Sequence, residues 1–131
     1  MTSKTVVKPW GKEKWIVHNK FYALKLITLN QGHRTSLHYH NEKHETYYVD
    51  RGRILSWLEN DNGVIDKEEL TAGSIVEIVP GKIHRVEAID DATLIEVSTP
   101  HLDDVIRVED DFGRGNGRIA SEHKAEAESG N

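Results

Sequence analysis

The sequence contains no cysteine, so it can form neither a disulfide nor a thiolate metal site, and any metal must be bound through nitrogen or oxygen. It also lacks long apolar runs. No segment approaches the roughly 20 apolar residues of a membrane-spanning helix, and residues 1–15 have no apolar signal core. We therefore expect no membrane partner and, because cysteine is absent, a cytoplasmic location.

Basic residues are not clustered. Seventeen Lys and Arg stand against 22 Asp and Glu, for a formal net charge of −5. Nonspecific nucleic-acid binding needs grouped Lys and Arg to neutralise phosphates. We therefore expect no nucleic-acid partner.

The chain has instead many short strand-like runs separated by turn residues, within a length of 131 residues that suits one domain. Turn signals include Asp50-Arg-Gly52 and Asp61-Asn-Gly63, and the second predicts a hairpin in which both central residues adopt positive φ. The predicted strands are Lys14–His18, Tyr22–Leu29, Thr35–Tyr39, Glu45–Val49, Ile54–Leu58, Ile75–Val79, Ile83–Ile89 and Leu94–Ser98. So many strands in a small domain predict an all-β fold, either a closed barrel or a two-sheet jelly roll.

The last part of the sequence is polar. Residues 101–114 are acidic with a few apolar anchors, and predict either a short helix or an extended flap over a barrel mouth. Residues 115–131 are nearly all small or polar, which predicts a disordered tail or a short solvated helix around Ser121–Glu128. The expected organisation is one domain over residues 1–114, followed by this tail.

Four side chains form a candidate metal site. His38 and His40 are two residues apart, so on a strand their side chains share one face. Glu45 lies on the next strand-like run and His84 on a later one. Burying four such groups in a barrel is costly unless a partner satisfies them. We predict one divalent transition metal, zinc in the first place, with iron, manganese or nickel as alternatives.

The same residues carry a family resemblance. Residues 32–52 fit the first cupin motif, G-x5-H-x-H-x4-E-x6-G, and residues 73–84 fit most of the second, G-x5-P-x-G-x2-H. The second motif departs at Val79, where proline is usual, but that position is not a ligand. The resemblance implies a small antiparallel jelly-roll (cupin) β-barrel with the metal inside its mouth.

A second resemblance concerns the substrate. Lys8-Pro-Trp-Gly11 and the segment Ile106–Arg114 are similar to the opening and closing signatures of the type II mannose-6-phosphate isomerase domain, often fused to mannose-1-phosphate guanylyltransferase. The similarity spans residues 8–114. It departs at His38, where the isomerase pattern has Gln, and at Thr46, where it has His. The resemblance implies a sugar phosphate as the small-molecule partner.

An isomerase of this kind needs a metal, a proton carrier and an anion site. The metal would stabilise an enediolate while a base moves a proton between C1 and C2. The local candidates for proton transfer are His44 and Tyr47, with Glu42 and Lys43 beside them. The candidates for phosphate binding are Arg34, Arg85, Arg107 and Arg114, although these arginines could instead pair with nearby aspartates.

Two other functions fit the sequence. Three His and one Glu also suit an iron- or nickel-dependent cupin dioxygenase, and His38 in place of Gln favours that reading. The alternative is a non-catalytic cupin that binds a sugar or another metabolite. In each case we expect a homodimer, because a small open jelly roll leaves strand edges and apolar faces to be covered.

Overall fold

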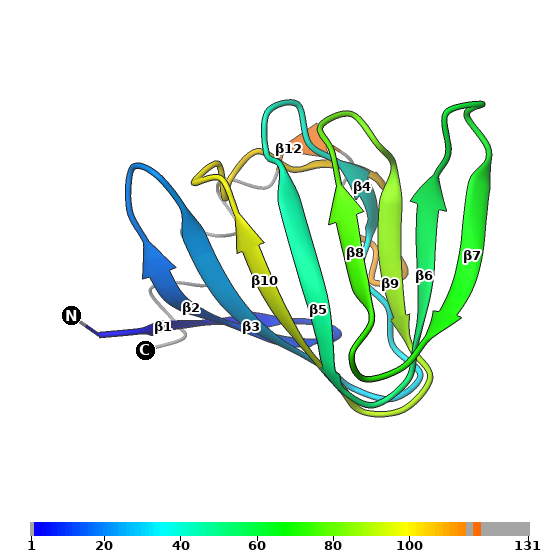
Figure 1. Ribbon diagram of the computed structural model, residues 1–131, viewed down its shortest axis with the longest axis horizontal. Helices are drawn as coiled ribbons and strands as arrows, with labels where there is room; N and C mark the ends of the chain where they lie inside the picture. Colours follow the sequence, from blue (N-terminus) through cyan, green and yellow to red (C-terminus); the bar gives the residue numbers. More distant parts are fainter. Residues whose placement is uncertain (1, 115–116, 119–131) are drawn as a thin grey trace.

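The chain folds into two six-stranded antiparallel sheets that face one another (Figure 1). The computed structural model describes residues 2–114 and 117–118, and within that range every regular element is a strand. The strands are β1 (Lys4–Lys8), β2 (Gly11–His18), β3 (Ala23–Leu29), β4 (Leu37–Tyr39), β5 (Glu45–Arg51), β6 (Ile54–Glu59), β7 (Ile65–Leu70), β8 (Ile75–Ile78), β9 (His84–Ala88), β10 (Ala92–Ser98), β11 (Ile106–Glu109) and β12 (Gly117–Arg118). The predicted all-β jelly roll is confirmed.

The strand order brings distant parts of the chain together. The first sheet runs β1-β2-β3-β10-β5-β8 and the second runs β12-β11-β4-β9-β6-β7. β10 lies between β3 and β5, and β4 lies between β11 and β9. The candidate histidines are therefore placed on or beside the neighbouring strands β4 and β9 of the second sheet, whereas Glu45 begins β5 of the first sheet.

Alternation of side chains separates the interior from the surface. Along β3, Ala23, Lys25, Ile27 and Leu29 are buried, and the residues between them are part-exposed. Because successive side chains on a strand point to opposite faces, the buried set lines the interior. Leu94 on β10 pairs in register with Ile27 and extends this apolar layer across the sheet. Lys25 is a charged residue on the same inward face.

Three strands outside the predicted set complete the described sheets before residue 115. They are β1, β7 and β11. β1 is an edge strand of the first sheet, and β7 is an edge strand of the second. β7 has no apolar alternation, because Asp66, Lys67, Glu68 and Glu69 are all exposed. It forms because it pairs with β6 along its whole length. Of the two structures predicted for residues 101–114, the extended one is observed, as β11.

The turn between β6 and β7 differs from the prediction. Gly63 has a positive φ of 78°, but Asn62 does not, so the two central positions of the expected turn are not both left-handed. The Gly63 N–H donates to the Asn60 carbonyl oxygen at 3.1 Å, and the Asn60 N–H donates to the Val64 carbonyl oxygen at 2.7 Å. This is a three-residue hairpin loop that needs left-handed backbone at one glycine alone.

Part of the predicted tail is structured. Gly117 and Arg118 form β12, which pairs with Arg107 and Ile106 of β11. The helix predicted around Ser121–Glu128 lies outside the described residues. Within the described range, no helix has the length and apolar character needed to span a membrane.

Candidate metal centre

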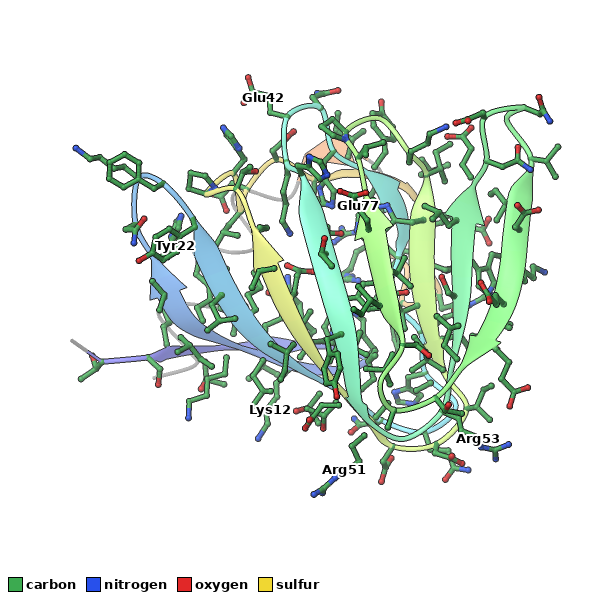
Figure 2. All side chains as sticks on the ribbon, in the orientation of Figure 1. Lys12, Tyr22, Glu42, Arg51, Arg53 and Glu77 are labelled. Carbon is green, nitrogen blue, oxygen red and sulfur yellow. The ribbon has the colours of Figure 1, made fainter. Side chains whose placement is uncertain are left out.

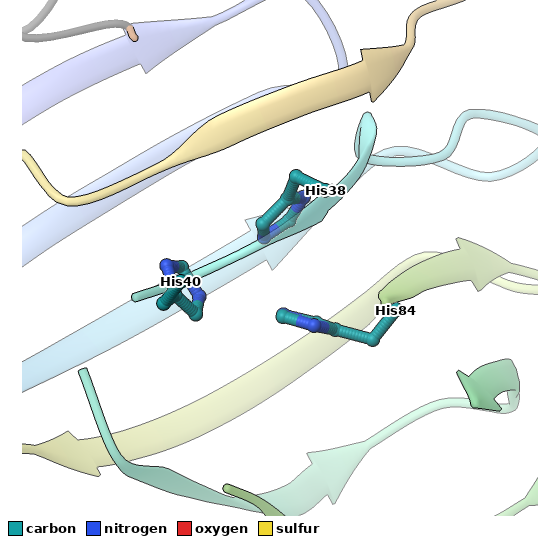
Figure 3. A group of neighbouring side chains, drawn as sticks. All are labelled: His38, His40 and His84. Atoms are coloured by element: carbon teal, nitrogen blue, oxygen red, sulfur yellow. The ribbon is translucent and has the colours of Figure 1, made fainter. Parts of the chain in front are cut away.

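Three histidines converge inside the barrel (Figure 3). His38 lies on β4 and His40 directly follows that strand, while His84 begins β9 and is the register partner of His38. One ring nitrogen of each lies within 4.8 Å of those of the other two, and the rings of His38 and His84 are 4.3 Å apart between centroids. This spacing is suited to a single ion bound between the three rings.

Backbone carbonyl groups orient all three rings. Nδ1 of His38 is 2.8 Å from the Ser36 oxygen, Nδ1 of His40 is 2.6 Å from the Asp104 oxygen, and Nδ1 of His84 is 2.8 Å from the Lys82 oxygen. A carbonyl oxygen can only accept, so each Nδ1 carries the proton and donates it. In its neutral form each ring therefore keeps its lone pair on Nε2, which is the arrangement of metal-binding histidines.

Two of the three rings, His38 and His40, are held in the neutral form. Burial, with the neighbouring His84 and His40, places the pKa of His38 well below its ordinary value of 6.5. Burial also lowers the pKa of His40, against the opposing effect of Glu45. In the described part of the chain, Nε2 of His40 and Nε2 of His84 are buried without a hydrogen-bond partner. A divalent cation would satisfy both atoms, so the residues present fit a metal.

Glu45 adjoins two of the three imidazoles. Its Oε1 lies 3.1 Å from Nε2 of His84 and 3.5 Å from Nε2 of His40. Burial opposes ionisation of this carboxyl group, but the Lys43 ammonium holds the pKa of Glu45 well below its usual range. The four predicted ligands thus meet in one place, as three imidazole rings and one carboxylate.

A cavity opens from these ligands between the two sheets. It has a volume of about 80 Å³ and is lined by all four of them. The lining also contains charged residues to which the sequence analysis assigned no role. These are Lys8, Glu13, Lys25 and Glu96, with Lys43 beside them as a group considered only for proton transfer.

Lys43 and Glu96 extend the metal site with a buried ion pair. Nζ of Lys43 is 2.8 Å from Oε2 of Glu45 and 3.0 Å from Oε2 of Glu96. Burial and the negative charge of Glu45 raise the pKa of Glu96 to about 7, against the effect of Lys43. The sequence contains one signal for Glu96. It lies two residues after Leu94, so on a strand its side chain shares the inward face of β10 with that leucine.

The two predicted proton carriers have different positions. Tyr47 is buried and lines the cavity. Burial raises the pKa of Tyr47 to about 12, so this phenol is protonated at neutral pH. His44 is exposed and does not line the cavity; its Nε2 lies 2.9 Å from Oε2 of Glu77, which lies on β8 near the rim of the barrel (Figure 2).

The four candidate arginines divide into two pairs. Arg107 and Arg114 line the cavity, and Arg114 also forms a two-point contact with Asp110, at 3.1 and 3.0 Å. Arg34 and Arg85 lie outside the cavity lining. Both guanidinium groups are 5.2 Å from the Trp57 ring, and Arg34 donates to Asp111 at 2.8 Å. Their observed contacts are structural ones.

Solved structures share this fold. The capsular polysaccharide assembling protein CapF from Staphylococcus aureus superposes with a TM-score of 0.70 at 18% identity, over 83% of this chain and 35% of CapF. KdgF from Halomonas sp. gives 0.67 at 21% identity, over 79% of this chain and 90% of KdgF. Oxalate decarboxylase from Bacillus subtilis gives 0.72 at 16% identity, over 81% of this chain and 30% of the enzyme. The chain thus spans about a third of CapF and of oxalate decarboxylase.

Sequence comparison gives the family. No curated protein matches the sequence closely enough to count as a relative. Residues 25–99 match the model of the Cupin domain family, Cupin_2, and this match covers more than half of the chain. The matched range contains His38, His40, Glu45 and His84. The chain therefore belongs to the cupin family, as its two motifs predicted.

Proposed function

We propose that this cupin is a metal-dependent enzyme acting on a sugar phosphate, and that it interconverts an aldose and a ketose in the manner of mannose-6-phosphate isomerase. One observation carries the proposal. Three imidazoles, each with Nδ1 bonded to a backbone carbonyl, bring their ring nitrogens within 4.8 Å of one another in a cavity that also holds cationic side chains. The first feature supports metal binding, and the second supports an anionic ligand.

The chain's own residues would divide the work. His38, His40, Glu45 and His84 would hold the ion, and Lys43 would keep Glu45 ionised and oriented. When bound, the ion would stabilise negative charge on the carbonyl oxygen of the sugar. Arg107 and Arg114 line the same cavity, from the segment that resembles the closing signature of the isomerase domain. Their guanidinium groups add positive charge to the cavity, which favours an anionic ligand.

Proton transfer falls to groups that line the cavity. Tyr47 is protonated at neutral pH, so it suits the donation of a hydrogen bond or a proton to a sugar oxygen. Glu96 is the cavity carboxylate placed behind Lys43 rather than against the histidines. We assign proton transfer to these two residues, because the exposed His44 would have to move to reach the substrate.

The proposal is tested by turnover. Protein loaded separately with zinc, manganese, iron or nickel is incubated with mannose 6-phosphate, and fructose 6-phosphate is followed by NMR. We expect conversion with at least one metal, and none with His84→Ala. The matched control is His101→Ala, which removes an exposed histidine. Absence of fructose 6-phosphate with every metal would refute the isomerase assignment.

The ligand set also favours a second function, an iron- or nickel-dependent dioxygenase. Here His38 provides a third imidazole where the isomerase pattern has Gln. Two histidines, a third nitrogen donor and a carboxylate are ligands that ferrous iron accepts. Oxygen uptake by the iron-loaded protein, with none from the zinc-loaded protein, would support this function over isomerisation.

A further inference from the structure

The cavity has a charge opposite to that of the whole protein. The chain has a formal net charge of −5. The cavity lining, however, contains five Lys and Arg side chains and three Glu side chains. Lysine is almost never fully buried unless it is paired, and a buried ammonium is costly. Three lysines nonetheless line this cavity and give it a positive wall.

Only one of these lysines belongs to the metal site. Lys43 lies between Glu45 and Glu96, so two carboxylates surround its charge. Lys8 and Lys25 lie on a different wall, formed by β1, β2 and β3. That wall contributes one carboxylate to the cavity, Glu13.

Lys25 is held in place by its surroundings. Its Nζ is 3.0 Å from Oε1 of Glu13 and lies 5.1 Å from the centre of the Trp15 ring. The indole N–H of Trp15 donates to the same Glu13 oxygen at 2.9 Å. An ammonium group has three donors, and the contact with Glu13 uses one of them. Glu13 and Trp15 therefore fix Lys25 while leaving it capacity to bind a further acceptor.

Lys8 is fixed from the backbone side. It is the last residue of β1 and is 6% exposed. The next residues turn the chain into β2, with Trp10 buried and its carbonyl oxygen accepting from the Asn30 N–H at 2.9 Å. The opening signature Lys8-Pro-Trp-Gly11 thus places a lysine side chain on the cavity wall.

We propose that Lys8 and Lys25 form an anion subsite, oriented by Glu13, that binds the charged group of the substrate while the sugar carbonyl lies at the histidines. This inference rests on the proposed function, since it names what selects the ligand of that site. The subsite would bind an oxyanion at the end of the sugar that is away from the carbonyl group. A phosphate and a uronate carboxylate both supply it.

Calorimetry tests the subsite with three sugars that differ at one end. The zinc-loaded protein is titrated with mannose 6-phosphate, mannuronate and mannose. We expect at least one of the charged sugars to bind about tenfold or more tightly than mannose. The tighter of the two identifies the oxyanion as phosphate or carboxylate. Equal affinity for all three sugars, or no binding of either charged sugar, would overturn the subsite.

Variants then locate the selectivity. We expect Lys8→Met to lower the affinity for the preferred charged sugar about tenfold and to leave the zinc content unchanged. Lys25→Met is made together with Glu13→Gln, so that no carboxylate is left buried and unpaired. We expect this double variant to lower the affinity to the same extent. The control is Lys12→Met, which removes the same charge from a side chain that projects away from the barrel (Figure 2). Wild-type affinity in both cavity variants would overturn the proposal.

The two proposals fail separately. If the charged sugar binds through Lys8 and Lys25 but is not isomerised, the isomerase assignment is refuted and the anion subsite stands. If isomerisation occurs and its KM is unchanged in both cavity variants, the subsite is refuted and the isomerase assignment stands.

Discussion

Nδ1 of His40 lies 2.6 Å from the backbone oxygen of Asp104, a residue 64 positions further along the chain. The side chain of Asp104 is bound to the same region. Its carboxylate accepts from the backbone N–H groups of Asn41, Glu42 and Lys43, at 3.2, 2.6 and 3.1 Å. Asp104 therefore orients one metal ligand and also fixes the loop that presents Lys43 to Glu45.

Asp104→Ala should loosen this loop. Three hydrogen bonds to a charged acceptor would be lost, so we expect the free energy of unfolding to fall by about 2–3 kcal/mol. Metal affinity should fall about tenfold or more, as it does when groups supporting metal ligands are removed. Urea unfolding and a zinc competition titration measure the two effects. Asp103→Ala, at the exposed neighbouring position, serves as the control. A similar loss in both variants would contradict the role given to Asp104.

Removal of a histidine should remove the metal. In His84→Ala one of three converging nitrogen donors is lost, and we expect metal content to fall from about one ion per chain to a small fraction of that. Elemental analysis after gel filtration measures it. His101→Ala should retain the wild-type content, because His101 is exposed and contacts Glu42. Equal metal content in the wild type and His84→Ala would contradict the site.

Glu96 should make stability depend on pH. Its pKa in the folded protein is raised to about 7 from 4.5, so between these values the folded state holds a proton that the unfolded state releases. The stability contributed by this group is therefore complete below pH 4.5 and is lost as the pH rises through 7. Glu96→Gln removes that dependence. From pH 5 to pH 8, the stability of Glu96→Gln relative to wild type should rise, by about 3 kcal/mol at most.

Chemical unfolding of metal-free protein at the two pH values measures this difference. Glu68→Gln on the exposed edge strand β7 is the control, and it should change stability by less than about 0.5 kcal/mol at both values. A difference between Glu96→Gln and wild type that does not vary with pH would contradict the assignment.

Two glycines of the first cupin motif should differ in their tolerance of a methyl group. Gly32 and Gly52 have similar φ values of +80° and +82°. A Cβ at Gly32 would meet nothing within 4 Å, whereas a Cβ at Gly52 would collide with the Asp91 carbonyl oxygen. We expect Gly32→Ala to cost about 1–2 kcal/mol from the left-handed backbone alone. Gly52→Ala should cost clearly more in urea unfolding, and equal losses would show that the close approach is unimportant.

Much of the fold was predictable because local patterns agree with it. Alternating apolar residues located the inner strands, and β3 is the clearest example, with Ala23, Ile27 and Leu29 all buried. The histidine and glutamate spacings of the two motifs located the family. Strand β7 was missed because an exposed edge strand can be polar on both faces, and pairing with β6 determines its conformation.

The cavity was less predictable, because it depends on which strands become neighbours. Lys25 is visible in the sequence as a charge within an apolar run, but its partner Glu13 is known only once β2 pairs with β3. The same holds for Lys43 and Glu96, which are separated by 53 residues. Sequence spacing located single ligands, and the tertiary structure supplied the ion pairs around them.

The register of β4 against β9 has a consequence for assembly of the site. His38 and His84 are direct cross-strand partners. A slip of one residue between these strands would turn one imidazole away from the barrel interior, because side chains alternate faces. An ion that needs both rings would bind to the native register and would not bind to a register shifted by one residue. Metal supplied during refolding should therefore favour the native register of β4 and β9 and raise the yield of correctly paired chains.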